Sequence, residues 1–201
     1  MERVVAEASL AKYRCQRVER TLMPIGHKYA RFEWERRFLL DCFPGQAIVT
    51  RVRRIEDRYI EGTTLRLRQQ SDDNGQTVFK LTQKLADKAA VARQGLITSI
   101  YLTATDFGVL ASLPAKVITK TRHSVPRFGI DVFDGVLSGL VLADAEFDSA
   151  LEAATFVLPS FVGPEVSDDP RFTGGRLVAA SREELKGWLA QYGIELKLER
   201  D

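Results

Sequence analysis

Alternation of apolar and polar residues dominates the chain from Arg31 onward and predicts strands. In Arg31–Leu40, the charged residues Glu33, Glu35 and Arg37 are spaced two apart, with Trp34 between the first two. Side chains two apart on a strand point the same way, so the three charges share one face and Trp34 lies on the other. Similar patterns predict seven further strands: Arg51–Ile60, Thr64–Gln70, Thr77–Leu85, Leu96–Leu102, Val117–Val125, Phe128–Phe133 and Gly139–Phe147.

Turn and capping residues separate these segments. The run Ser71-Asp72-Asp73-Asn74-Gly75 is typical of a hairpin loop. Thr105 is suited to cap a helix over Asp106–Leu113, and Ser181-Arg182-Glu183-Glu184 is a capping box for a helix that continues to about Tyr192. So many strands without long connections indicate an α+β domain built on a barrel or on two packed sheets.

The chain divides into three predicted parts. Residues 1–28 carry no site signal, and we expect them to form a mobile N-terminal extension. Residues 29–180 hold the predicted strands and form the main domain. Residues 181–201 hold the C-terminal helix, which we expect to pack on that domain.

Composition narrows the function classes. The 201 residues carry 29 Lys+Arg against 27 Asp+Glu, a formal net charge of +2, which argues against a nucleic-acid binder. The two cysteines have neither the density nor the spacing of a disulfide framework or a zinc site. No apolar run approaches the roughly 20 residues of a membrane span. We therefore expect a cytoplasmic protein without a membrane or nucleic-acid partner.

Ten charged residues occupy the alternating positions of the predicted strands. If the opposite, apolar faces pack against helices outside, the charged faces must line a wet barrel interior. Basic side chains suit phosphate oxygens, and carboxylates suit Mg²⁺ or Mn²⁺. The alternative is that these charges form the solvent face of an ordinary antiparallel sheet. The ten are Glu33, Glu35, Arg37, Arg66, Arg68, Lys84, Lys120, Arg122, Asp144 and Glu146.

Seven short motifs follow one another between residues 29 and 178. They are Glu33-Trp34-Glu35-Arg36-Arg37, Leu65-Arg66-Leu67-Arg68, Leu81–Lys84, Lys120–Arg122, Ile130–Gly135, Ala143–Phe147 and Glu165–Phe172. In this order they resemble the CYTH domain, or triphosphate tunnel metalloenzyme, superfamily. The family's hallmark is an ExExK motif on the first strand, which this chain matches with Arg37 in the place of the lysine.

The resemblance implies a mainly antiparallel, eight-stranded closed barrel, the triphosphate tunnel, with a few peripheral helices. It implies an Mg²⁺- or Mn²⁺-dependent enzyme acting on a triphosphate-containing small molecule. By the same resemblance, the metal ligands are Glu33, Glu35, Asp144 and Glu146. The phosphate contacts are Arg37, Arg66, Arg68, Lys84, Lys120 and Arg122, and the catalytic residues are Glu33, Glu35 and Lys84.

The chain departs from the family pattern on one strand. Family members often carry glutamates there, whereas Leu96–Leu102 holds Ile97, Thr98, Ser99 and Ile100. Our leading hypothesis is metal-dependent hydrolysis of a triphosphate, inorganic tripolyphosphate first. The alternatives are adenylate cyclisation, for which no adenine or ribose site is visible, and a non-catalytic binder of polyphosphate or phosphorylated ligands. The oligomeric state does not follow from the sequence, and a homodimer stays open.

Overall fold

The computed structural model describes residues 30–45, 49–86 and 94–196. The predicted N-terminal extension over residues 1–28 therefore lies outside the described residues. Within the described ranges, each helix is too short or too polar to cross a membrane.

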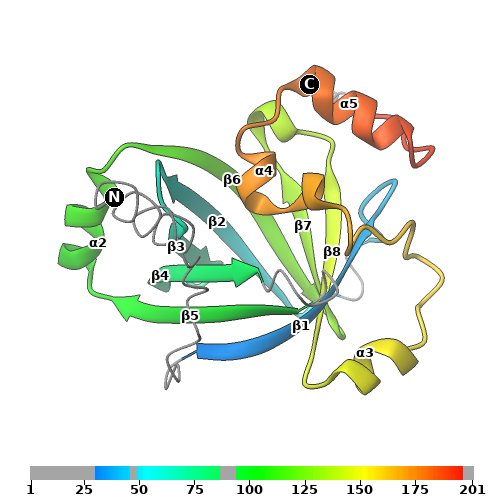
Figure 1. Ribbon diagram of the computed structural model, residues 1–201, viewed down its shortest axis with the longest axis horizontal. Coiled ribbons are helices and arrows are strands. Elements are labelled where there is room, and N and C mark those ends of the chain that lie inside the picture. Colours follow the sequence, from blue (N-terminus) through cyan, green and yellow to red (C-terminus); the bar gives the residue numbers. More distant parts are fainter. Residues whose placement is uncertain (1–29, 46–48, 87–93, 197–201) are drawn as a thin grey trace, which may run out of the picture.

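An antiparallel barrel forms the body of the protein (Figure 1). Its strand order is β1-β5-β4-β3-β2-β6-β7-β8, and pairing between β8 and β1 closes the circle. The expected closed barrel of eight strands is confirmed for the described residues. The strands are β1 (Ala30–Leu39), β2 (Arg51–Ile60), β3 (Leu65–Asp72), β4 (Thr77–Ala86), β5 (Gln94–Leu102), β6 (Ala115–Val125), β7 (Phe128–Phe133) and β8 (Val141–Phe147).

Short helices lie around the barrel. The helix α5 (Arg182–Ala190) begins at the capping box of Ser181, as predicted, and ends two residues earlier than expected. The elements that the sequence pattern did not predict are η2 (Gly135–Leu137), α3 (Ala150–Thr155), η3 (Pro170–Phe172) and α4 (Gly174–Leu177).

The predicted start of the helix after β5 was wrong by two residues. Helix α2 spans Ala104–Ala111, and its cap is Thr103 rather than Thr105. The Thr103 hydroxyl accepts a hydrogen bond from the Asp106 N–H, and the Asp106 carboxylate accepts one from the Thr103 N–H. A capping box needs an acid three residues after the cap, and only Thr103 has one at that spacing.

Two apolar clusters form the core, one at an end of the barrel and one on its outer face. The first packs Leu185, Trp188 and Leu189 of α5 against residues such as Leu39 and Leu142 at one end of the barrel. The second covers β1, β7 and β8 with α3 and the chain that follows it. Because successive side chains of a strand point to opposite faces, the residues of β1, β7 and β8 that alternate with this outer cluster point inward.

The segment that hydrogen-bonds to one edge of β1 changes along the strand. Among the described residues, β5 pairs with β1 from Ala30 to Trp34. Farther along the same strand, residues 163–167 hydrogen-bond to β1: the Gly163 N–H donates to the Leu39 carbonyl and the Leu39 N–H donates to the Pro164 carbonyl. We call residues 163–173 the strap, because they run along the edge of β1 and then across one end of the barrel.

Removing the α5 anchor tests how much the barrel depends on its C-terminal helix. Leu185 is fully buried, so Leu185→Ala should lower the free energy of unfolding by about 2–5 kcal/mol. The neighbouring Lys186 is exposed, and Lys186→Ala should change it by less than about 0.5 kcal/mol. Urea unfolding of both variants measures the difference. Equal stabilities would show that α5 does not support the domain.

Candidate active site

A cavity of about 500 Å³ lies inside the barrel, and all eight strands contribute side chains to it. The structure brings all ten charged residues that the sequence pattern singled out into this one cavity, so they do not form an outer solvent face. Ser167, Phe172 and Thr173 of the strap also line it. At the same end, Gly174 lies against Tyr59: a Cβ there would be 1.8 Å from the Tyr59 Oη, so only glycine fits.

Two basic residues of β3 are held by an aspartate of β2. Asp57 is 1% exposed and accepts hydrogen bonds from Nε and Nη2 of Arg68 at 2.6 and 2.7 Å. The Nε of Arg66 lies 3.5 Å from the same carboxylate. Burial raises the pKa of Asp57, but the charges of Arg68 and Arg66 outweigh it and bring the pKa to about 2.

A second buried aspartate holds two basic residues of β6. Asp131 on β7 is 1% exposed, and Arg122 binds it through Nε and Nη2 at 2.6 and 2.7 Å. Lys120 donates to the same carboxylate. Burial raises the pKa of Asp131, and the charges of Arg122 and Lys120 lower it below its ordinary value. These two arrangements leave Nη1 of Arg68 and of Arg122 without a hydrogen bond to another described residue.

Sequence reasoning did not select Asp57 and Asp131 as site residues. Each is the only acid on its face of the strand, whereas the selected carboxylates occur in pairs two residues apart. The signal that could have found them is the same alternation: Asp57 shares a face with Tyr59, and Asp131 lies between the apolar Ile130 and Val132.

Charged residues of β1 and β8 face one another across the strand pair. Glu35 lies opposite Glu146, and Arg37 lies opposite Asp144. Arg37 binds the Glu35 carboxylate through Nη2 and the Asp144 carboxylate through Nε, the latter at 2.7 Å. Arg122 reaches Asp144 as well, at 2.9 Å. These contacts join the β1–β8 charges to the group around Asp131.

Lys84 of β4 forms ion pairs with the two glutamates of β1. Its Nζ lies 2.7 Å from Glu35 and 3.2 Å from Glu33. Burial raises the pKa of Glu35, but the positive charges of Arg37 and Lys84 lower it far below its ordinary range. For Lys84 the signs are reversed. Burial lowers its pKa, but the charges of Glu35 and Glu33 outweigh burial and raise the pKa above its ordinary value.

Glu146 differs from the other carboxylates of the cavity. It makes no hydrogen bond or ion pair with another described residue. Its pKa is raised, mainly by burial and then by the negative charge of Glu33. Negative charge therefore gathers around Glu33, Glu35 and Glu146 without full compensation, which suits a hard divalent cation. In the described part of the chain, no group of three His, Cys, Asp or Glu side chains is already arranged to hold a metal ion. The Glu35 carboxylate forms ion pairs with Arg37 and Lys84 instead.

The charges lining the cavity balance. Six basic residues face it, namely Arg37, Arg66, Arg68, Lys84, Lys120 and Arg122. Six acidic residues face it as well, namely Glu33, Glu35, Asp57, Asp131, Asp144 and Glu146. The formal charge of the described lining is therefore zero. From the part of β5 whose side chains the structure describes, only Ile97 lines the cavity, and the Ser99 hydroxyl is paired with that of Thr82 at 2.9 Å.

The chain is similar to known proteins in sequence and in fold. No family model matches the chain. An inorganic triphosphatase from Nitrosomonas europaea is 34% identical over 151 residues, which are 70% of this chain and 92% of that protein. A crystal structure of an inorganic triphosphatase is 26% identical, covers 74% of this chain and 95% of its own, and has a TM-score of 0.49. A conserved protein from Pyrococcus furiosus is 14% identical, over 83% of this chain and 97% of its own, at a TM-score of 0.41.

Replacing Asp57 tests the buried ion pairs. Asp57→Asn leaves Arg68 and Arg66 without their counter-ion and should cost about 3–5 kcal/mol of unfolding free energy at pH 7. Because the folded-state pKa is about 2, below the ordinary value, the contribution of Asp57 is fully present above about pH 4 and is lost as the pH falls through 2.

Urea unfolding from pH 5 to pH 2 measures this contribution. The wild type should lose about 2–3 kcal/mol more than the variant over that range. Parallel curves for the two proteins would show that Asp57 is not charged and paired inside the barrel.

Proposed function

Because this chain belongs to the CYTH, or triphosphate tunnel metalloenzyme, superfamily, we propose that it hydrolyses inorganic tripolyphosphate with the help of a divalent cation. The observation that carries the proposal is the convergence of six basic and six acidic side chains on one cavity inside the barrel. The resemblance to a triphosphatase over 92% of that relative supports the reaction class.

The basic residues are suited to hold a chain of phosphates. Nη1 of Arg68 and of Arg122 is left for a phosphate oxygen, because Nε and Nη2 of each are engaged by aspartate. The aspartates keep both guanidinium groups in place before the ligand arrives, which lowers the ordering cost of binding. A cavity of about 500 Å³ lies within the range of small-ligand sites.

The balanced lining accounts for the expected metal. A tripolyphosphate anion brings several negative charges into a cavity whose own formal charge is zero, so positive charge must enter with it. Glu33, Glu35 and Glu146 would hold Mg²⁺ or Mn²⁺, with Asp144 next to them. The cation supplies charge neutralisation and polarises the phosphoryl oxygens.

The chain's own residues account for the remaining steps. A water oxygen forms a bond to the terminal phosphorus, the bridging P–O bond breaks, and orthophosphate and pyrophosphate leave. Arg37, Lys84 and Arg122 stabilise the charge that spreads over the transferred group. Among the described residues, Lys84 forms ion pairs only with Glu33 and Glu35, so its ammonium could turn to the phosphate if these carboxylates held the metal.

The second candidate is a protein that binds polyphosphate without hydrolysing it. Strand β5 favours this alternative, because its sequence holds no carboxylate that could orient water, and Ile97 is what its described side chains contribute to the cavity.

Glu35→Gln tests the proposed metal ligand. It removes a negative charge that both the cation and Lys84 contact, so phosphate release from tripolyphosphate with Mg²⁺ or Mn²⁺ should fall on the order of 100-fold. Glu183→Gln, at an exposed position of α5, is the matched control and should keep the wild-type rate. Equal rates in all three proteins would remove Glu35 from the site.

Chelation of divalent metal tests the charge argument. Without Mg²⁺ and Mn²⁺, the wild type should release no phosphate, and either ion should restore release. ATP assayed in parallel, with detection of cyclic AMP, distinguishes cyclisation from hydrolysis. Calorimetric binding of tripolyphosphate without phosphate release under every metal condition would establish the binder instead.

A further inference from the structure

Two consecutive arginines of β1 lie on opposite sides of the barrel wall. Arg37 points into the cavity, whereas Arg36 points outward yet is 9% exposed. The Arg36 guanidinium donates to both carboxylate oxygens of Glu165 in the strap, at 3.1 and 2.7 Å, and to the Ala153 carbonyl of α3 at 3.1 Å. Arg36 therefore fixes the strap to β1 from the outside.

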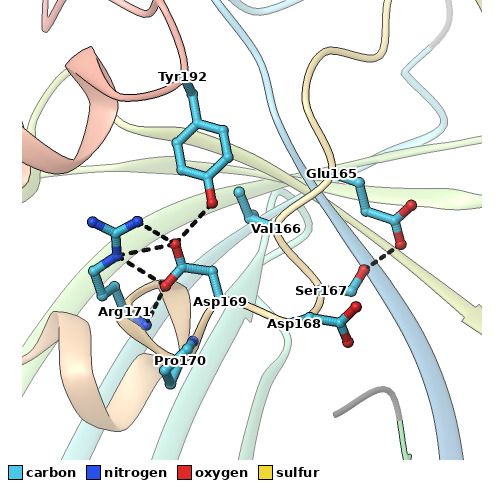
Figure 2. Close-up of a pocket in the computed structure, with 8 residues that line it drawn as sticks. All are labelled: Glu165, Val166, Ser167, Asp168, Asp169, Pro170, Arg171 and Tyr192. Carbon is cyan, nitrogen blue, oxygen red and sulfur yellow. Dashed lines mark hydrogen bonds and ion pairs between the residues drawn. The ribbon is translucent and has the colours of Figure 1, made fainter. Parts of the chain in front are cut away.

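Ser167 connects this outer ion pair to the inside of the barrel. Its hydroxyl donates to Glu165 at 2.6 Å and accepts from the backbone N–H of Arg37 at 3.0 Å. Glu165 and Ser167 lie side by side (Figure 2) and line an outer hollow, which has a volume of about 450 Å³. Ser167 lines that hollow and the barrel cavity alike, so the strap is the wall between them.

The strap also holds Arg37 at two further points. The Arg37 carbonyl accepts from the Val166 N–H at 2.8 Å, and Nη1 of Arg37 donates to the Phe172 carbonyl at 3.0 Å. Beyond Ser167, Asp169 pairs with Arg171 and accepts from the Tyr192 hydroxyl at 2.8 Å, which attaches the strap to the chain after α5 (Figure 2). Both ends of the strap are thus anchored.

The remaining contacts of Arg37 are to groups that the proposed metal requires. Glu35 and Asp144 bind its guanidinium, and both lie in the proposed metal site. A cation held by these carboxylates would weaken their hold on Arg37. The Ser167 hydroxyl binds the Arg37 backbone N–H and the Phe172 carbonyl binds Nη1, and both are neutral groups outside that carboxylate set, so these two bonds would remain.

We propose that Ser167 and Glu165 are positioning residues, which act through Arg37 to keep its guanidinium directed at the phosphate chain while the metal is bound. This inference rests on the proposed function. In this proposal the outer pair Arg36–Glu165 and the strap contribute to ligand binding indirectly. They act through Arg37 and do not themselves contact the phosphate.

Ser167→Ala tests the proposal by removing a single hydroxyl. Tripolyphosphate affinity in the presence of Mg²⁺, measured by calorimetry, should fall about tenfold, and kcat/KM for phosphate release should fall with it. Ser167→Thr, which keeps the hydroxyl, should restore most of the loss. Ser160→Ala, the same change at an exposed site just before the strap, is the matched control and should bind as the wild type does.

A double-mutant cycle separates positioning from general support of the fold. In an Arg37→Ala background, Ser167→Ala should have no further effect on tripolyphosphate affinity, because the side chain that it positions is gone. A tenfold loss in both backgrounds, or no loss in either, would overturn the proposal while leaving the proposed function in place. A wild type that neither binds nor hydrolyses tripolyphosphate would overturn the proposed function itself.

Discussion

Buried pairing between aspartate and basic side chains is the constraint on which the rest of the structure depends. Six basic residues directed into one barrel would repel each other strongly in a medium of low dielectric constant. Asp57 and Asp131 each engage two of them and are themselves almost inaccessible to water. Removing one partner of such a pair leaves an uncompensated buried charge, which is far more costly than the pair is favourable. The barrel interior is therefore stable only as a whole.

The same pairing determines how a ligand can bind. The aspartates fix the direction of Arg68 and Arg122, whereas the carboxylates of β1 and β8 are held by side chains that have alternative partners. Lys84 bridges Glu33 and Glu35, and Glu146 has no cationic partner among the described residues. One side of the cavity is thus preorganised for anions, and the other has carboxylates available for a cation. A metal–polyphosphate complex needs both properties at once.

Period-two alternation was sufficient to predict the strands and to place ten charged residues on one face. It worked because β1, β3, β6 and β8 each carry their charged cavity residues two positions apart. Asp57 and Asp131 were not selected because each is the only acid on its face of a strand and its partners lie on neighbouring strands, so its role follows from the strand pairing. The segment Glu165–Phe172 was recognised as a motif, but its contacts were not predicted, because Ser167 and Glu165 contact Arg37 and Arg36, which are 130 and 129 residues away in the chain.

The change of hydrogen-bonding partner along β1 explains why closure of the barrel and the geometry of the cavity depend on each other. Beyond Trp34, β5 no longer covers the edge of β1, and backbone groups there need other partners. The strap supplies them from the C-terminal part of the chain, and its Ser167 and Phe172 reach Arg37 in doing so. The segment that completes the wall through backbone hydrogen bonds thus also supplies the Phe172 carbonyl that binds a charged side chain of the cavity. A chain that closes its barrel in this way cannot lose the strap without disturbing Arg37.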